Sequence, residues 1–137
     1  MFSFLCLKVT YLPFMSRVII ILSLLFFVSC TELNQYQQII AATNRIEISY
    51  RDSGKTIILT EQQTVAFKNI LTRDVIPKLQ RKFLYDVVID LYKDSNRIGY
   101  IRILNNPEHP FANFSSDSLG FGFDLPYGIG MFIGNLK

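Results

Sequence analysis

The stretch YDVVIDLYKDSNRIGYIRIL, residues 85–104, decides the fold because it holds two strand patterns separated by a turn. Its first half alternates, and four large apolar side chains share one face: Tyr85, Val87, Ile89 and Leu91. Residues 93–97 have the composition of a turn, and residues 98–104 return as a β-branched and aromatic strand. This stretch therefore predicts an antiparallel hairpin.

A second hairpin is predicted upstream. Residues 45–50 alternate with a period of two, which places Ile46, Ile48 and Tyr50 on one face of a half-buried strand. Residues 52–55 are turn formers, and Gly54 among them can adopt a positive φ without steric cost. Residues 56–59 then form the return strand.

A helix is predicted between the two hairpins. Thr60 and Gln63 have the spacing of a capping box, in which each side chain bonds the backbone N–H of the other residue. We expect the helix to end near Asp74 or Pro77, because proline disfavours helical geometry in the residue before it. The expected core stripe is Val65, Ala66, Ile70 and Leu71, and the expected outward side chains are Gln62, Lys68 and Asn69.

The C-terminal segment is rich in glycine and aromatic residues. Six of the thirteen aromatic residues after Cys30 follow Pro110. One interpretation is one or two final strands that bury Leu119, Phe121, Phe123 and Leu125. The alternative is an exposed interaction surface, because large apolar patches mark binding sites; its residues would be Phe121, Phe123, Tyr127 and Phe132.

The order hairpin, helix, hairpin and further strand predicts one small α+β domain over residues 45–137. We expect an antiparallel sheet of about four to six strands with one main helix on one face. Residues 30–44 are expected to hold a short polar tether, residues 31–38, and a short helix over residues 33–42. Four apolar residues at helical spacing predict that helix: Leu33, Tyr36, Ile39 and Ile40.

The N-terminal segment has the layout of an export signal. Residues 18–28 are apolar except for Ser23, with Arg17 before them and the small residue Ser29 after them. A helix of this length reaches about 16 Å, whereas the hydrocarbon core of a bilayer is about 30 Å thick. We therefore expect residues 1–29 to be a cleaved signal peptide. Because an additional apolar block with Lys8 precedes Arg17, a translation start at Met15 is an alternative hypothesis to Met1.

The residues Phe27-Val28-Ser29-Cys30 resemble the lipobox of bacterial lipoproteins, with Phe27 where leucine is usual. The resemblance implies a diacylglyceryl thioether on Cys30, cleavage before it and acylation of the new amino terminus. Three acyl chains exceed what stable anchoring requires. The implied location is the bacterial cell envelope, anchored in the membrane and facing the periplasm or in the outer membrane. An uncleaved anchor made by residues 18–27 is the alternative.

The charge balance and the cysteine content of the chain after Cys30 limit the function classes that the domain can belong to. All 11 acidic residues follow Cys30, and removing Lys8 and Arg17 leaves 12 basic residues, so the net charge there is near +1. This balance gives no support to nucleic-acid binding, which needs a clustered basic face. The basic cluster at residues 78–82 is interpreted as a solvated face, with a phosphate or lipid-headgroup site as the alternative. Cys6 and Cys30 leave no disulfide in the domain.

No catalytic constellation is recognised. Asp86 and Asp90 lie on the polar face of a predicted strand, where exposed charges are the rule. The chain has one histidine, His109, and Glu108, Asp117 and Asp124 lack a recognised metal-ligand spacing. We therefore predict no catalytic residue, no metal site and no cofactor.

These observations lead to a functional hypothesis of a lipid-anchored bacterial envelope protein that acts as a non-catalytic binding module. The expected contacts are the membrane, through the lipid on Cys30, and an envelope protein, with no nucleic acid. Two alternatives remain: a small single-pass membrane-anchored protein with a soluble outer domain, and a small envelope hydrolase that uses Asp86, Asp90 or His109.

Overall fold

The structure is a computed structural model that describes residues 14–73, 75–104, 106 and 108–136. It divides into two compact units, Met1–Thr31 and Glu32–Lys137. Helix α1, Phe14–Ala42, contributes residues to both units. The expectations for residues 1–13, and for the side chains of Arg17 and Cys30, lie outside the described residues.

Across the residues that the structure describes, no helix has the length and hydropathy that crossing a membrane would require.

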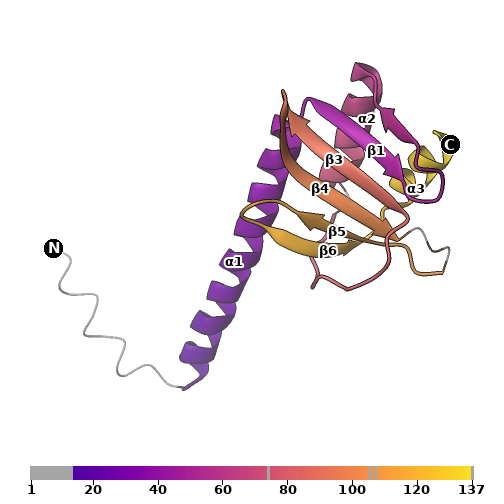
Figure 1. Cartoon of the computed structure of the whole chain (residues 1–137). Coiled ribbons are helices and arrows are strands. Elements are labelled where there is room, and N and C mark those ends of the chain that lie inside the picture. The colour runs from indigo at the N-terminus through magenta and orange to yellow at the C-terminus, as the bar shows by residue number, and fades with distance from the viewer. Residues whose placement is uncertain (1–13, 74, 105, 107, 137) are drawn as a thin grey trace. The chain divides into compact units, whose positions relative to one another are not determined.

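The second unit has the α+β fold that the sequence predicts for residues 45–137, and it begins earlier, at Glu32 (Figure 1). Its six strands form one sheet in the order β2-β1-β3-β4-β5-β6, and every neighbouring pair is antiparallel. The strands are β1 Arg45–Tyr50, β2 Thr56–Ile58, β3 Val87–Lys93, β4 Asn96–Leu104, β5 Phe111–Ser115 and β6 Gly120–Asp124. The other helices are α2, Glu61–Arg73, and α3, Tyr127–Asn135.

Both predicted hairpins are confirmed. In the first, β1 and β2 pair through Ile48 and Ile57, and Gly54 in the turn has a φ of 64°. In the second, β3 and β4 pair through Ile89 and Ile101, and the inward residues Val87, Ile89 and Leu91 are buried as their alternation predicts. The expectation that Tyr85 shares this face is wrong: it precedes β3 and is half-buried, with its ring beside Arg51 and Arg102. The turn of the second hairpin holds Asp94 at a φ of 56°.

The capping box is also confirmed. The backbone N–H of Thr60 donates to Gln63 Oε1 at 2.9 Å, and that of Gln63 donates to Thr60 Oγ1 at 3.2 Å. Helix α2 ends at Arg73, before Asp74, which lies outside the described residues.

The predicted core stripe of α2 is wrong in part. Val65 and Ala66 are exposed, whereas the buried residues are Thr64, Phe67 and Leu71. These three lie at i, i+3 and i+7, which is itself a helical face, rotated from the one expected. Lys68 is also partly buried: its Nζ donates to the carbonyls of Ala41 at 2.9 Å and Thr43 at 2.7 Å. It thereby satisfies carbonyls at the end of α1, which have no partner inside that helix.

The part of α1 that belongs to the second unit packs on the sheet. Residues 33–42 are helical as predicted, and Tyr36 and Ile40 are fully buried. The Tyr36 ring lies edge-on to Phe114 at 5.0 Å, and its hydroxyl donates to Leu71 O at 3.1 Å. Residues 31–38, expected as a polar tether, are helical and include this core residue.

The C-terminal strands bury the four residues expected: Leu119, Phe121, Phe123 and Leu125. Helix α3, which follows them, is not anticipated by the sequence interpretation. It buries Ile129 and Ile133, one helical turn apart, and Tyr50 donates its hydroxyl hydrogen to Ile133 O at 2.9 Å. This packing outweighs the low helix propensity of its three glycines.

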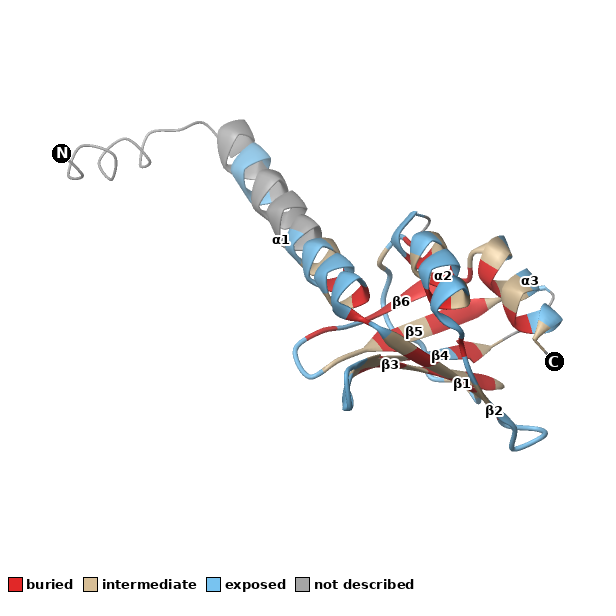
Figure 2. Cartoon of the chain, turned by 90° about the horizontal axis from the view of Figure 1, so that it is seen from above, coloured by how far each residue is buried: buried red, intermediate tan, exposed pale blue. Residues whose placement is uncertain are grey.

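The two faces of the sheet differ. Figure 2 shows α2 and α3 side by side over one face, where the red, buried parts of the strands lie. The core is on this side and includes Ile46, Ile89, Ile101, Phe114 and Phe123. The outward residues of β1, β3 and β4 are half-buried or exposed, so this part of the second face is open.

Candidate functional site

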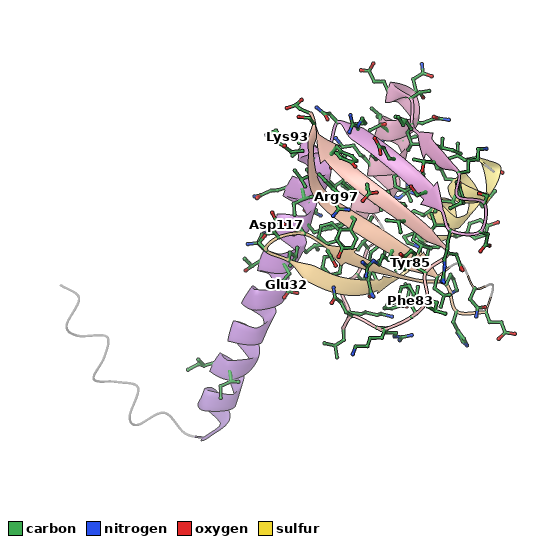
Figure 3. All side chains as sticks on the ribbon, in the orientation of Figure 1. Glu32, Phe83, Tyr85, Lys93, Arg97 and Asp117 are labelled. Carbon is green, nitrogen blue, oxygen red and sulfur yellow. The ribbon has the colours of Figure 1, made fainter. Side chains whose placement is uncertain are left out.

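Tyrosines and arginines gather on the open face of the sheet. Alternation places Tyr92 on β3 and Tyr100 on β4 outward, and Tyr85 precedes β3. Figure 3 shows Arg97 and Tyr85 on this side of the domain. We call this set of residues the tyrosine-arginine face: Arg45, Arg51, Tyr85, Tyr92, Arg97, Tyr100 and Arg102.

Each arginine of this face lies over a tyrosine ring. The guanidinium carbon of Arg45 is 4.3 Å from the centre of the Tyr92 ring. The guanidinium carbon of Arg102 is 5.0 Å from the Tyr100 ring and 5.3 Å from the Tyr85 ring. Such contacts contribute about 0.5–1 kcal/mol each at exposed sites, so they favour ordered guanidinium groups over free rotation.

Two carboxylates neutralise part of the face. Glu47 on β1 lies directly opposite Asp90 on β3, a like-charge pair that would be destabilising alone. Arg45 Nε is 3.3 Å from Glu47 Oε1, and Arg97 Nη1 is 3.0 Å from Asp90 Oδ1. Each acid therefore has its own arginine.

The other end of the face keeps its positive charge. Arg51 and Arg102 are exposed and make no ion pair with any residue that the structure describes. Their guanidinium carbons lie 5.9 Å and 5.3 Å from the centre of the Tyr85 ring. Two unpaired guanidinium groups beside one aromatic ring can recognise a carboxylate and an apolar group together.

The residues considered for catalysis are not gathered into one site. Asp90 is paired with Arg97 within the tyrosine-arginine face. The backbone N–H of Asp86 donates to Ile103 O at 2.9 Å at the start of β3. His109 is instead in the loop before β5 and lines a pocket of about 320 Å³.

The pocket at His109 is polar but holds no recognisable nucleophile. It is lined by Arg81, Glu108, His109, Pro110, Phe111, Asp124 and Leu125, and no serine, threonine or cysteine is among them. Asp117, the third acid considered as a metal ligand, lies in the turn between β5 and β6. In the described part of the chain, no three potential ligands form a metal-binding cluster.

The hypothesis of an aromatic interaction surface is wrong for two of its four residues. Phe121 and Phe123 are buried, because they occupy the inward positions of β6 and pack against the core. Phe132 is half-buried, with its ring 5.2 Å from that of Phe67. Tyr127 alone is largely exposed, at 82%, beside a small apolar pocket of about 360 Å³ that Met131 also lines.

Cys30, the predicted lipidation site, belongs to the helical backbone of α1. Its side chain lies outside the described residues.

The sequence interpretation missed the tyrosine-arginine face, although its signal was present. The alternation that turns Ile46 and Ile89 inward also turns Arg45, Tyr92 and Tyr100 outward. What the pattern alone lacks is the strand order, which brings β1, β3 and β4 side by side.

In comparisons with protein-family models, curated proteins and solved structures, the chain matches none.

Proposed function

We propose that this chain is a lipid-anchored bacterial envelope protein that acts as a non-catalytic binding module. Its tyrosine-arginine face binds a protein partner that presents acidic side chains. The observation that carries the proposal is the open sheet face, on which three tyrosines are ordered by four arginines.

Residue chemistry supports a protein as the partner. Tyrosine and arginine are enriched at protein interfaces and at their energetic hot spots, because they combine large contact area with polar groups. The unpaired Arg51 and Arg102 favour a partner with carboxylates. Glu47 and Asp90 neutralise two of the four arginines, so the face lacks the clustered positive charge that a polyphosphate backbone requires, which argues against nucleic acid.

The resemblance of Phe27-Val28-Ser29-Cys30 to a lipobox supports the anchor. The test is the intact mass of the protein extracted from membranes, compared with Cys30→Ala. We expect a mass that begins at an acylated residue 30 in the wild type, and loss of that species in the variant. A mass that retains residues 18–27 would instead favour the single-pass alternative.

The binding face is tested by affinity capture from cross-linked envelopes. We expect wild type to retain a specific protein and Arg102→Gln to lose it at least tenfold, since charge-assisted hydrogen bonds are lost. The matched control is Lys93→Gln, which removes one exposed positive charge at the end of β3 outside the tyrosine-arginine face. Equal capture by both variants would contradict the proposed face.

A further inference from the structure

The segment between α2 and β3 exposes large apolar side chains. Ile76 is 73% exposed, Leu79 90% and Leu84 74%, although all three are aliphatic. The other exposed large apolar residues described in this unit lie singly or in pairs: Ile58, Val65, Tyr127 and Met131. We call residues 75–86 the basic-apolar segment. A solvated loop gives no reason for this concentration, since exposed apolar clusters mark interaction sites.

The segment is nevertheless held firmly on the sheet. Lys78 and Gly122 of β6 exchange both backbone hydrogen bonds, at 2.6 Å and 2.8 Å, and Lys78 forms an ion pair with Asp124. Asn113 of β5 accepts from the backbone N–H of Arg81 at 3.2 Å and donates to Arg81 O at 2.6 Å. Figure 1 shows the segment as an irregular stretch beside β6. Its exposed side chains are thus presented by an ordered backbone.

Charge accompanies the apolar side chains. Lys78, Arg81 and Lys82 lie between Leu84 and Ile76 in sequence, and residues 75–85 contain no acid. Lys78 is paired with Asp124, whereas Lys82 is exposed and makes no ion pair with a described residue. Arg81 lies over the Phe111 ring at 4.4 Å. Exposed aliphatic groups beside cations are complementary to an anionic lipid surface, which offers both an acyl boundary and negative headgroups.

We propose that the basic-apolar segment is a membrane-contact site that inserts Leu79 and its neighbours into the interface of a bilayer containing anionic lipids. An acidic protein would satisfy Lys82, but it gives no reason for three separate, largely exposed aliphatic side chains. A bilayer with anionic lipids accounts for both the exposed aliphatic side chains and the basic side chains, because it offers an apolar interior and negative headgroups.

The proposed anchor makes this contact feasible, and this step depends on the proposed function. Tyr36 is six residues after Cys30, so the chain between them spans at most about 21 Å even when extended. The Tyr36 ring packs on Phe114 and Phe121, at 5.0 Å and 5.2 Å, in β5 and β6. These are the strands that hold the basic-apolar segment. A lipid on Cys30 would therefore keep the segment close to the membrane surface.

The test uses a fluorescent reporter, because the chain contains no tryptophan. The full protein carrying Leu79→Trp is purified from membranes and reconstituted into vesicles of phosphatidylcholine with about a third phosphatidylglycerol. The matched control is Val65→Trp, an exposed apolar position on α2. Brominated acyl chains then report whether each indole reaches the hydrocarbon.

We expect bromolipid quenching and a blue-shifted emission for Leu79→Trp, and neither for Val65→Trp. Adding Lys82→Gln to Leu79→Trp should weaken insertion about fivefold, the factor that corresponds to one basic residue near an anionic surface. Lys93→Gln should leave insertion unchanged.

Two results would overturn the inference. One is the absence of quenching at Leu79→Trp in anchored protein. The other is a blue shift that appears without vesicles and rises with protein concentration, which would show a second copy of the chain as the occupant. If Cys30 proves unmodified but Leu79→Trp still inserts, the proposed anchor fails while this inference stands.

Discussion

The helix-covered face and the open face of the sheet are built from the same strands but are determined by different forces. On the covered face, residues such as Ile89, Ile101 and Phe114 are fully buried, and apolar burial at about 25 cal/mol per Å² specifies them. On the open face, tyrosine rings and guanidinium groups contact one another, and each contact contributes only about 0.5–1 kcal/mol. The comparison teaches that stability resides on one face, which leaves the other free to bind.

The largest expected effect comes from breaking the covered face. Phe114→Ala removes a fully buried ring that packs against Tyr36 and Phe121. We expect a loss of about 3–5 kcal/mol in unfolding free energy, a large part of the total for a domain of this size. Urea unfolding followed by circular dichroism measures it. A loss below about 1 kcal/mol would contradict the packing described.

The next largest loss of stability is expected where the basic-apolar segment pairs with β6 at Gly122. A Cβ on Gly122 would lie 2.5 Å from Phe111 Cζ and 2.6 Å from the backbone oxygen of Leu79. Because backbone cannot move aside cheaply, Gly122→Ala should cost about 1–3 kcal/mol and loosen the segment. Faster tryptic cleavage at Arg81 and Lys82 would report the loosening.

The control for this prediction is Gly134→Ala. Apart from its chain neighbours and the backbone of its own helix, no heavy atom of a described residue lies within 4 Å of its added Cβ, and the residue belongs to α3. We expect a neutral or slightly stabilising change, of up to about 1 kcal/mol, from the higher helix propensity of alanine. Equal destabilisation by the two glycine substitutions would show that the close approach at Gly122 is not the cause.

A smaller effect, and a pH dependence, is expected at Tyr36. Burial raises the pKa of its phenol above the ordinary value, so the folded state keeps the proton while the unfolded state releases it. Stability is therefore unaffected below pH about 10 and falls as the pH rises further, by about 1.4 kcal/mol per pH unit.

Tyr36→Phe should reduce this alkaline dependence and leave the part due to Tyr50, whose pKa burial also raises. The variant should cost about 1 kcal/mol at neutral pH, because the hydrogen bond to Leu71 O is lost. Unfolding free energies of wild type and variant at pH 7, 10 and 11 measure both effects. An unchanged alkaline slope in the variant would assign the dependence to other groups.

The smallest effect on stability is expected on the open face. Arg102 is exposed and makes no ion pair with a described residue, so Arg102→Gln loses only its contacts with the Tyr85 and Tyr100 rings and should lower the unfolding free energy by about 1 kcal/mol or less. A thermal unfolding curve shows this directly. A loss of several kcal/mol would mean that the tyrosine-arginine face is structural, which would remove its main support as a binding site.

Sequence patterns predicted the parts of the fold that local physics determines. The hairpin at residues 85–104, the strand at Arg45–Tyr50 and the capping box at Thr60 all follow from side-chain alternation or from hydrogen bonds within three residues. The order of these hairpins and the helix along the chain was sufficient to predict the α+β class.

Parts of the structure that depend on distant contacts were not predictable in the same way. Helix α3 forms around three glycines because Ile129 and Ile133 pack on the core. Helix α2 buries a different face from the one that its own apolar pattern predicts. Phe67 lies inward because it packs in the core of the domain. The tyrosine-arginine face likewise depends on strand order, which no single strand pattern contains.

The most direct test of the proposed function is site-specific photocrosslinking in living cells. A benzophenone side chain replaces Tyr100 on the open face or, as the control, the exposed Asn69 on α2. We expect a discrete protein adduct from position 100, none from position 69, and loss of the adduct when Arg102→Gln is added. An adduct from position 69 with none from position 100 would contradict a binding module that uses the open face of the sheet.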